Sequence, residues 1–448
     1  MAADFRSNEL FSDGSDVGLH PYANRVSLNN EVHSRPFITI NSPARCTNIA
    51  MLHGPEGAAG HDAAAEWAHL EKLCAHYGVA LSSDVKNHLI VDFGSFQLKW
   101  ERHTEFSSYT FLRDGAGKDS FEDSALQVVP EHWLKNLPGQ MLVGVHLVVQ
   151  ASTGEAPYDP ETLKEVFGTN GLIGARVSGG CATAWTDFRL HKDGFTRILV
   201  QNISMSRHQT GRLLQRLWEI ETYRMMALLS MTHTGDVGAQ TRAIELKLAR
   251  HVGRMANVHD EDKEQELLEI LTGLAAEVEQ LSAQTSFRFN ASKAYYALVL
   301  KRIDNIKEQH IEGIQRLSSF IDRRMAPAMR TVESMDERIS ILSRRVNRAS
   351  NLLQVRINTT LQAQNKELLK SMDRRAQLQL RLQQTVEGLS VVAISYYALG
   401  IVKIVAQAGG KIWPLPDATV ITAACSPFVI GLVYYGIHRV RRYVDKAV

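Results

Sequence analysis

The chain of 448 residues is long enough for two or three domains, or for one domain followed by long helices. Its net charge of +2 is unevenly spread: residues 1–319 carry 31 Lys and Arg against 39 Asp and Glu, and residues 320–448 carry 19 against 9. The basic excess lies on helical sequence without interleaved aromatic residues, which argues against nucleic-acid binding. The four cysteines form no C-x-x-C pair, so neither zinc sites nor disulfides are predicted, and they are typical of reduced cytosolic proteins.

The first two segments are predicted to be an extended polar arm, residues 1–43, and an α+β head, residues 44–204. The arm is irregular and lacks the apolar stretch of a secretory signal peptide, so residues 1–388 are expected to stay in the cytoplasm. The head combines β-rich apolar runs with two helical patterns, at 62–77 and 160–167.

The head can be divided into two similar halves. Each half reads as β-α-β-β, with residues 118–137 as an insertion between them. Gly94 and Trp100 in the first half correspond to Gly180 and Trp185 in the second, and a charged turn and an aromatic strand follow each tryptophan. A duplicated unit would explain this likeness, and so would a chance match.

One group of side chains in the head is a weak metal candidate. Glu101, His103 and Glu105 alternate along an expected strand, so all three can face one side and hold a divalent ion. A solvated polar face, or pairing with Arg and Lys on a neighbouring strand, explains the same pattern. No bound cofactor is predicted.

Two short motifs resemble nucleotide-binding sequences without matching them. Residues 54–60 read GPEGAAG between a strand and a helix, but they lack both phosphate-loop spacings, and Glu56 and Asp62 would repel phosphate. A flexible loop is the favoured interpretation. Residues 92–94 read DFG without the His-Arg-Asp loop of kinases, which predicts a turn between strands.

From residue 207 the apolar period changes to 3.6, so residues 205–326 are predicted to be helical. Breaks are expected at Gly235, at residues 259–260 and at Pro327. The acidic run that begins at Asp260 is typical of a helix N-terminus, and a metal site is the less favoured alternative.

Residues 328–388 are predicted to form a long stalk helix, since residues 329–387 contain neither Gly nor Pro. At 1.5 Å per residue this helix would be roughly 90 Å long. Its apolar seam combines 11-residue and 3- or 4-residue steps, as in a coiled coil between chains. Antiparallel pairing with a helix at 295–321, through a turn at Pro327, is the alternative, and both can hold together. The seam consists of Met335, Ile339, Leu342, Val346, Leu353, Ile357, Leu361, Leu368 and Met372.

The C-terminal sequence predicts a transmembrane hairpin at residues 389–437, with spans at 389–408 and 418–437, followed by a basic tail at 438–448. Each span has the roughly 20 apolar residues that a helix needs to cross a bilayer. A buried helix pair in a soluble bundle is the alternative. Basic residues flank the hairpin on both outer sides, so both termini and the head are expected in the cytoplasm, at a bacterial inner membrane. The tail residues Arg439, Arg441 and Arg442 are expected to contact anionic lipids.

Three positions of the first span are candidates for a role in the membrane. Lys403 is costly if it faces lipid, so it either snorkels towards the nearby non-cytoplasmic surface or has a functional role. Ser395 and Gly400 are polar or small positions that could line a pore.

Four segments carry a resemblance to a known family: residues 30–37 (NEVHSRPF), 98–106 (LKWERHTEF), 219–224 (EIETYR) and 378–397 (LQLRLQQTVEGLSVVAISYY). Over nearly its whole length the chain resembles a bacterial family of predicted membrane-anchored proteins with a domain of unknown function. This resemblance implies membrane anchorage and no reaction. The architecture is more loosely similar to CorA-type magnesium channels, whose Gly-Met-Asn signature is replaced here by Gln407-Ala-Gly-Gly-Lys411.

These observations favour a non-enzymatic, homo-oligomeric membrane anchor, scaffold or sensor with a ligand- or partner-binding head. The chain contains no G-x-S-x-G, H-E-x-x-H or paired-cysteine motif. The alternative is a CorA-like cation channel or transporter that lacks the signature of that family.

Overall fold

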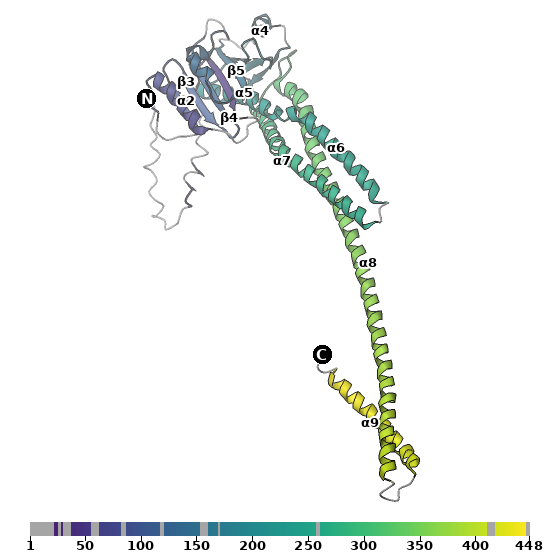
Figure 1. Ribbon diagram of the computed structural model, residues 1–448. Helices are drawn as coiled ribbons and strands as arrows, with labels where there is room; N and C mark the ends of the chain where they lie inside the picture. The colour runs from purple at the N-terminus through teal and green to yellow at the C-terminus, as the bar shows by residue number, and fades with distance from the viewer. Residues whose placement is uncertain are drawn as a thin grey trace. The chain divides into compact units, whose positions relative to one another are not determined.

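The computed structural model describes residues 22–25, 28–29, 37–54, 62–81, 87–116, 121–152, 160–168, 171–256, 260–409 and 417–444. The chain divides into two compact units, Met1–Ala256 with Glu269–Arg348 and Asn257–Leu268 with Ala349–Val448, which we call unit 1 and unit 2. An α/β sheet domain is followed by long helices and a C-terminal helix (Figure 1), which confirms the predicted order of elements.

The described residues of unit 1 form one mixed sheet of eight strands, in the order β2-β3-β4-β1-β5-β8-β7-β6. The central strands β1 and β5 are buried along most of their length. Their continuous burial fits strands that are covered on both faces. The strands are β1 (Ala44–Leu52), β2 (His88–Asp92), β3 (Gln97–Arg102), β4 (Phe106–Asp114), β5 (Gln140–Ala151), β6 (Ile173–Val177), β7 (Ala182–Thr186) and β8 (Thr196–Asn202).

The two halves of the sheet share their element order but not their strand directions. Each half has one strand, a helix and three further strands, and the middle strands β3 and β7 carry the buried Trp100 and Trp185. However, β1 pairs with β4 antiparallel, whereas β5 pairs with β8 in parallel. The predicted β-α-β-β order is therefore wrong by one strand in each half, and the different strand directions show that the halves are not a simple repeat of one unit.

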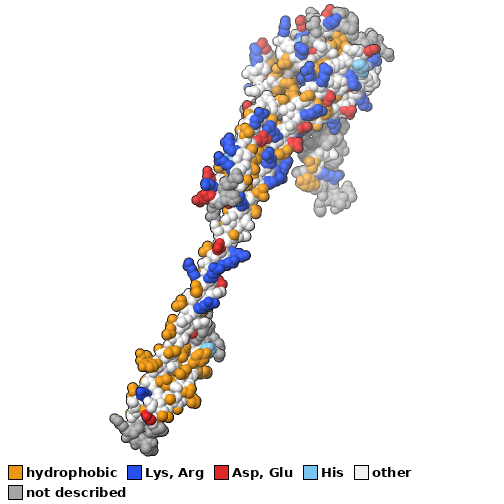
Figure 2. Space-filling view, turned by 90° about the vertical axis from the view of Figure 1, so that its right-hand side faces the viewer, with side chains coloured by type: hydrophobic (Ala, Val, Ile, Leu, Met, Phe, Trp, Pro, Cys, Tyr) orange, Lys and Arg blue, Asp and Glu red, His pale blue; other side chains and the backbone are white. Residues whose placement is uncertain are grey.

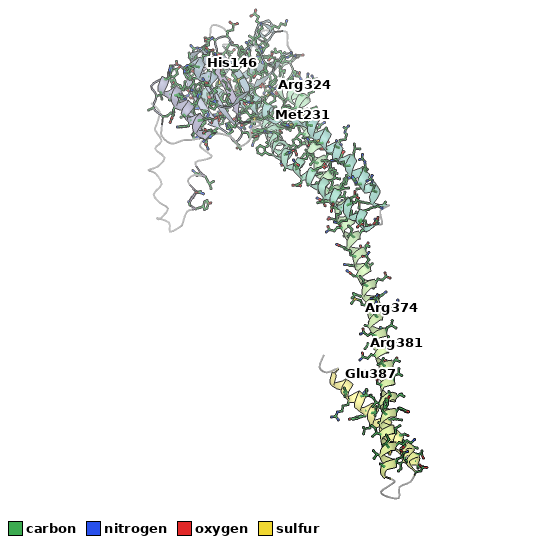
Figure 3. The ribbon with its side chains drawn as sticks, viewed as in Figure 1. His146, Met231, Arg324, Arg374, Arg381 and Glu387 are labelled. Atoms are coloured by element: carbon green, nitrogen blue, oxygen red, sulfur yellow. The ribbon has the colours of Figure 1, made fainter. Side chains whose placement is uncertain are left out.

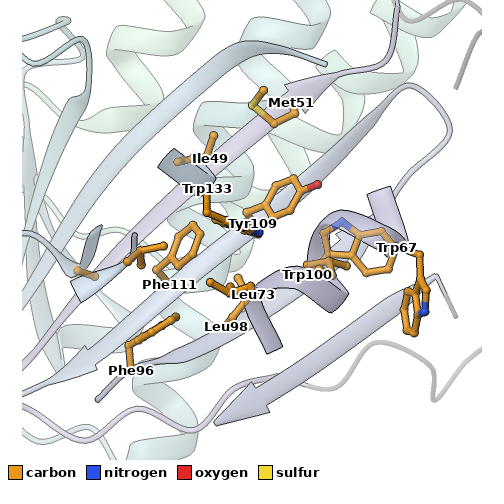
Figure 4. Close-up of a cluster of buried hydrophobic side chains, with 13 residues drawn as sticks. Ile49, Met51, Trp67, Leu73, Phe96, Leu98, Trp100, Tyr109, Phe111 and Trp133 are labelled. Carbon is orange, nitrogen blue, oxygen red and sulfur yellow. The ribbon is translucent and has the colours of Figure 1, made fainter. Parts of the chain in front are cut away.

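One face of the sheet is covered by α2 (Ala63–His76), η3 (Ala125–Val128), α3 (Glu131–Lys135) and α4 (Pro160–Phe167). Asp62 caps α2, because its Oδ1 accepts hydrogen bonds at 3.0 Å from two backbone amides of the first turn. The core beneath α2 and α3 is rich in aromatic side chains (Figure 4), and Trp67 meets Trp100 edge-to-face with 6.0 Å between ring centroids. Ala125, Val129 and Trp133 belong to this core, so the predicted insertion contributes to it.

The opposite face of the sheet is covered by α5 (Arg207–Leu228), which starts with a capping box between Ser206 and Gln209. Leu213 and Leu214 on this helix are completely buried. At Gly211 an added Cβ would lie 1.7 Å from the backbone oxygen of Ile38, so only glycine permits this close approach.

Four long helices follow, namely α6 (Met231–Met255), α7 (Glu261–Asn305), α8 (Leu317–Gly409) and α9 (Ala418–Val444). The predicted breaks at Gly235 and Pro327 are wrong, because both residues lie inside helices. The turn between α7 and α8 occupies residues 306–316. A proline loses its own amide hydrogen bond, and burial of Met325 and Met329 on either side of Pro327 holds this helix together.

Within unit 1, ion pairs join α6, α7 and α8 into a bundle. Lys247 of α6 bonds Glu277 of α7 at 2.9 Å, and Lys293 of α7 bonds Asp336 of α8 at 2.5 Å. A further pair joins Arg338 of α8 to a carboxylate of α6. The part of the predicted apolar seam that lies in unit 1 supplies the α8 side of this bundle.

The seam changes its environment along α8. Ile339, Leu342 and Val346 are buried in unit 1, as intramolecular packing requires. The predicted partner helix at 295–321 is wrong, because residues 306–316 form the turn between α7 and α8. In unit 2, Leu361 and Leu368 are 44% and 60% exposed. The prediction of a coiled coil between chains therefore applies only to the exposed part of the seam in unit 2, namely Leu361, Leu368 and Met372, which we call the lower seam.

Candidate functional site

The predicted metal site at Glu101, His103 and Glu105 is not assembled. Strand β3 ends at Arg102, so His103 and Glu105 lie in the turn to β4 and the expected alternation stops. Glu101 Oε1 lies 3.0 Å from Lys99 Nζ, and the His103 ring stacks on Phe106 with 4.4 Å between centroids. Among the described residues, no three or more His, Cys, Asp or Glu side chains are grouped to hold a metal ion.

Lys99 instead begins a buried polar chain between the sheet and the helices. Its Nζ donates to Gln215 Oε1 at 3.2 Å, and Gln215 Nε2 donates to Glu219 Oε1 at 2.9 Å. Glu219 then pairs with Arg302 of α7. Buried charges are costly unless they are paired, so this chain fixes the position of α5 between β3 and α7.

Glu105 forms a second buried ion pair, with Arg288 of α7 at 2.5 Å. Both side chains are nearly inaccessible to solvent. Burial, and then the charge of Glu105, raises the pKa of the neighbouring Tyr295. Glu101 and Glu105 therefore pair with Lys and Arg, but the predicted pairing across strands is wrong, because Lys99 lies on the same strand as Glu101 and Arg288 lies on α7.

A buried cluster of His53, Glu66 and Ser107 was not predicted, because its members come from three separate elements. Ser107 Oγ lies 2.9 Å from both His53 Nε2 and Glu66 Oε2, and Glu66 Oε1 lies 3.6 Å from the same His53 Nε2. A hydrolytic triad needs the carboxylate at the other ring nitrogen. With exposures of 3% or less, the cluster is part of the packed interior.

The DFG turn is confirmed between β2 and β3, where Gly94 has φ +78° and its amide donates to Asp92 Oδ1 at 2.8 Å. Residues 55–61 of the glycine-rich loop lie outside the described residues.

A pocket of about 380 Å³ lies between α2 and α3. His69 and Trp133 stack at its floor with 4.5 Å between ring centroids. His69 Nε2 donates to the backbone oxygen of Trp133 at 3.0 Å, and Trp133 Nε1 donates to the backbone oxygen of His69 at 2.8 Å. Burial is the main cause that lowers the pKa of His69, and the charge of Lys72 adds to it. The rim of the pocket carries Lys72, His76 and His132.

Unit 2 contains the C-terminal part of α8 and α9, which are both long and apolar enough to cross a membrane. Only 6% and 0% of their most apolar stretches are buried. Figure 2 shows hydrophobic side chains gathered over these helices, after a stretch of α8 that carries Lys and Arg. That stretch includes Arg374 and Arg381 (Figure 3).

The three membrane candidates occupy different surroundings in unit 2. Ser395 is 5% exposed, whereas Gly400 and Lys403 are exposed and line a groove of about 550 Å³ between α8 and α9. Asp417 caps α9 at the loop end of this helix pair. The backbone amide of Thr419, and more weakly the charge of Lys403, lowers the pKa of Asp417. Lys403 therefore lies near the loop end of this helix pair.

A family model described as "Protein of unknown function (DUF3422)" matches residues 20–444. The chain belongs to the DUF3422 family. This match confirms the predicted membership of an uncharacterised family and adds no support for the likeness to CorA-type channels. No curated protein matches the chain.

One side of the pocket between α2 and α3 could have been predicted from the sequence of this DUF3422 member. His69, Lys72 and His76 follow one another at helical spacings of three and four, which places them on one face of α2. His132 lies 56 residues after His76, and only the packing of α3 against α2 brings the two rings to 6.4 Å between centroids. Sequence reasoning missed this pocket because no motif connects the two helices.

Proposed function

We propose that the protein is a membrane-anchored, non-enzymatic scaffold or sensor whose α/β domain receives a ligand or partner. The observation that carries this proposal is the exposure of the two apolar helices in unit 2. Phe428 and Leu432 on α9 are 81% and 75% exposed. Leaving such side chains in water forgoes about 1.5–3 kcal/mol each, which a bilayer restores.

The low burial of the two apolar helices also disfavours the alternative of a soluble helix pair. A core helix of a soluble protein is mostly buried, whereas 6% or less of each apolar stretch is buried here. Neighbouring positions such as Val392 and Ile401 are also more than 60% exposed. A hydrocarbon solvent accounts for this surface without any further protein partner.

The proposed orientation follows from the basic flanks. Arg374, Arg375 and Arg381 precede the first span, and Arg439 and Arg441 follow the second. Lys and Arg are retained on the cytoplasmic side of bacterial membranes, so the proposal places both termini and the α/β domain in the cytoplasm. In this arrangement the basic tail lies beside anionic lipid headgroups at the inner membrane.

The proposed assembly is a homo-oligomer that forms along the lower seam of α8. Leu368, Met372 and Leu382 are each at least 60% exposed on a stretch of α8 where every described side chain from Asn358 to Val386 is exposed. A second copy of the same helix would cover these side chains in a coiled coil.

A non-enzymatic role is supported by the contacts of the polar side chains in unit 1. Lys99, Glu105 and Ser107 make buried contacts with other protein groups, as expected of structural residues. No observation specifically favours the alternative of a cation channel. The position of Lys403 near the loop end fits snorkelling better than the lining of a cation pore.

Membrane extraction tests the proposal. The full chain should stay in the membrane pellet after washing with alkaline carbonate. Exchanging Phe428 and Leu432 together for Arg should shift the protein towards the soluble fraction, because each Arg at the centre of a span costs about 2.5–3.5 kcal/mol.

The matched control exchanges Leu378 and Leu382 for Arg. These residues have the same spacing and are 60% and 66% exposed, but they precede the first span. This control should remain in the membrane. Release of the unaltered chain by carbonate, or equal release of both double variants, would contradict membrane anchorage by these helices.

A further inference from the structure

The pocket between α2 and α3 differs from the other described polar clusters because its charged rim is open to solvent. Lys72, His76 and His132 are exposed, whereas His69 and Trp133 beneath them are buried. Its volume of about 380 Å³ falls in the range of sites that hold small molecules.

The floor of this pocket is held rigidly. The side chains of His69 and Trp133 each donate a hydrogen bond to the backbone oxygen of the other residue, at 3.0 and 2.8 Å. Because a carbonyl oxygen only accepts, Nε2 of His69 carries a hydrogen. Two reciprocal bonds and a ring stack join α2 to α3, so the rim groups on these helices keep their spacing before any ligand binds.

The electrostatics of the pocket favour an anion. Its lining contains one lysine and three histidines and, among the described residues, no Asp or Glu. Of the nearby acids, Glu131 on α3 is neutralised by Lys135 at 2.6 Å, and Glu71 on α2 is exposed outside the lining. His76 lies in the last turn of α2 and belongs to the same lining.

A metal ion fits these residues less well than an anion does. The pocket offers neutral or cationic nitrogens and no carboxylate, and no metal-binding group is found among the residues that the structure describes. Lysine is a donor only and repels cations. The Lys72 ammonium and the imidazole N–H groups are, by contrast, suitable donors to phosphate or carboxylate oxygens.

We infer that this pocket is a binding site for a small molecule that carries an oxyanion, with Lys72 and His132 as the contacting groups and the His69–Trp133 stack as the floor. This inference deepens the proposed function, because it names a ligand class for the α/β domain. A binding measurement tests the oxyanion site, and membrane extraction tests the anchorage. Either proposal can therefore fail without the other.

Calorimetric titration with inorganic phosphate tests the site. The full chain is placed in nanodiscs of zwitterionic lipid at pH 6. Phosphate should bind saturably, at one site per chain, above a sodium chloride control of equal ionic strength. Lys72→Ala and His132→Ala should each weaken binding about tenfold, as expected when a hydrogen bond to a charged group is removed.

Lys301→Ala is the matched control, because Lys301 is an exposed lysine of unit 1 on α7, outside the pocket. It should bind phosphate as the unaltered chain does. Absence of saturable binding, or equal weakening by Lys301→Ala and Lys72→Ala, would overturn the inference. Both pocket variants alter exposed side chains, and unchanged tryptophan fluorescence will show that they fold.

Nanodiscs that contain phosphatidic acid distinguish a lipid headgroup from a dissolved anion. If lipid phosphate occupies the pocket, these nanodiscs should abolish the heat of phosphate binding. If the ligand is dissolved, phosphate should bind equally in both kinds of nanodisc. Each of these two results supports an oxyanion site, and each identifies whether the oxyanion belongs to a lipid or to a dissolved molecule.

Discussion

At the scale of single residues, His146 is the group whose environment most clearly links stability to pH. Its ring stacks on Phe195 with 4.3 Å between centroids, and Nδ1 lies 2.8 Å from Thr47 Oγ1. Burial lowers the pKa of His146 to about 4, against the raising effect of Asp193 at 4.0 Å and with a smaller lowering effect of Arg197. The folded protein therefore holds this ring neutral at a pH where the unfolded chain protonates it.

This difference predicts a loss of stability in acid. Because the folded pKa is below the unfolded value of 6.5, the contribution of His146 is complete above pH 6.5 and is lost as the pH falls towards 4. The change amounts to about 3 kcal/mol for a shift of this size. His146→Gln should flatten the decline of the unfolding free energy over this range.

Urea unfolding of the full chain, followed by tryptophan fluorescence, measures this effect, since five of the six tryptophans lie in unit 1. His132→Gln is the control, because this histidine is exposed. An identical pH profile for His146→Gln and the unaltered chain would show that His146 does not carry the dependence.

The single-residue predictions failed where distant partners decide the outcome. The predicted alternation stops at the turn after Arg102, and the partner of Glu105 is Arg288, which depends on the packing of α7. The alternation of side chains along one strand carries no information about Arg288, which lies 183 residues after Glu105.

At the scale of elements, the lower seam of α8 offers the clearest test of assembly. Leu361→Glu together with Leu368→Glu should convert an oligomer into monomers, because these substitutions place charges in the core of the proposed coiled coil. Ala363→Glu places a charge on the opposite side of the same exposed stretch and should leave the oligomer intact.

Mass photometry of the detergent-solubilised chain distinguishes these outcomes. A monomeric mass for the unaltered chain at all concentrations would exclude assembly through this seam. Dissociation by Ala363→Glu as well would point to a general effect of charge and not to the apolar side of the helix.

Elements with strong periodic patterns were predicted well, and their ends were predicted less well. The strands of the head and the long helices follow from apolar runs and from an apolar period of 3.6. Pro327 misplaced the turn between α7 and α8, because burial of neighbouring side chains such as Met325 and Met329 outweighs the lost hydrogen bond of one proline. The parallel pairing of β5 with β8 was not predicted either, because an apolar run does not indicate the direction of its strand.

At the scale of the whole molecule, the proposed function depends on which side of the membrane the two termini occupy. The outer flanks of the hairpin carry most of its basic residues, and its connecting loop contains only Lys411. This asymmetry favours cytoplasmic termini, because moving Lys and Arg across a bacterial membrane during insertion is strongly disfavoured.

Reporter fusions test this orientation in cells. Green fluorescent protein fused after Val448 should fluoresce, since it folds in the cytoplasm, and alkaline phosphatase at the same place should be inactive. Alkaline phosphatase inserted after Gly409 should be active. Exchanging Arg439, Arg441 and Arg442 for Gln should weaken the preference, because it removes most of the positive charge that retains the tail. The opposite pattern of activities would place the α/β domain outside the cytoplasm and would require a different source for its ligand.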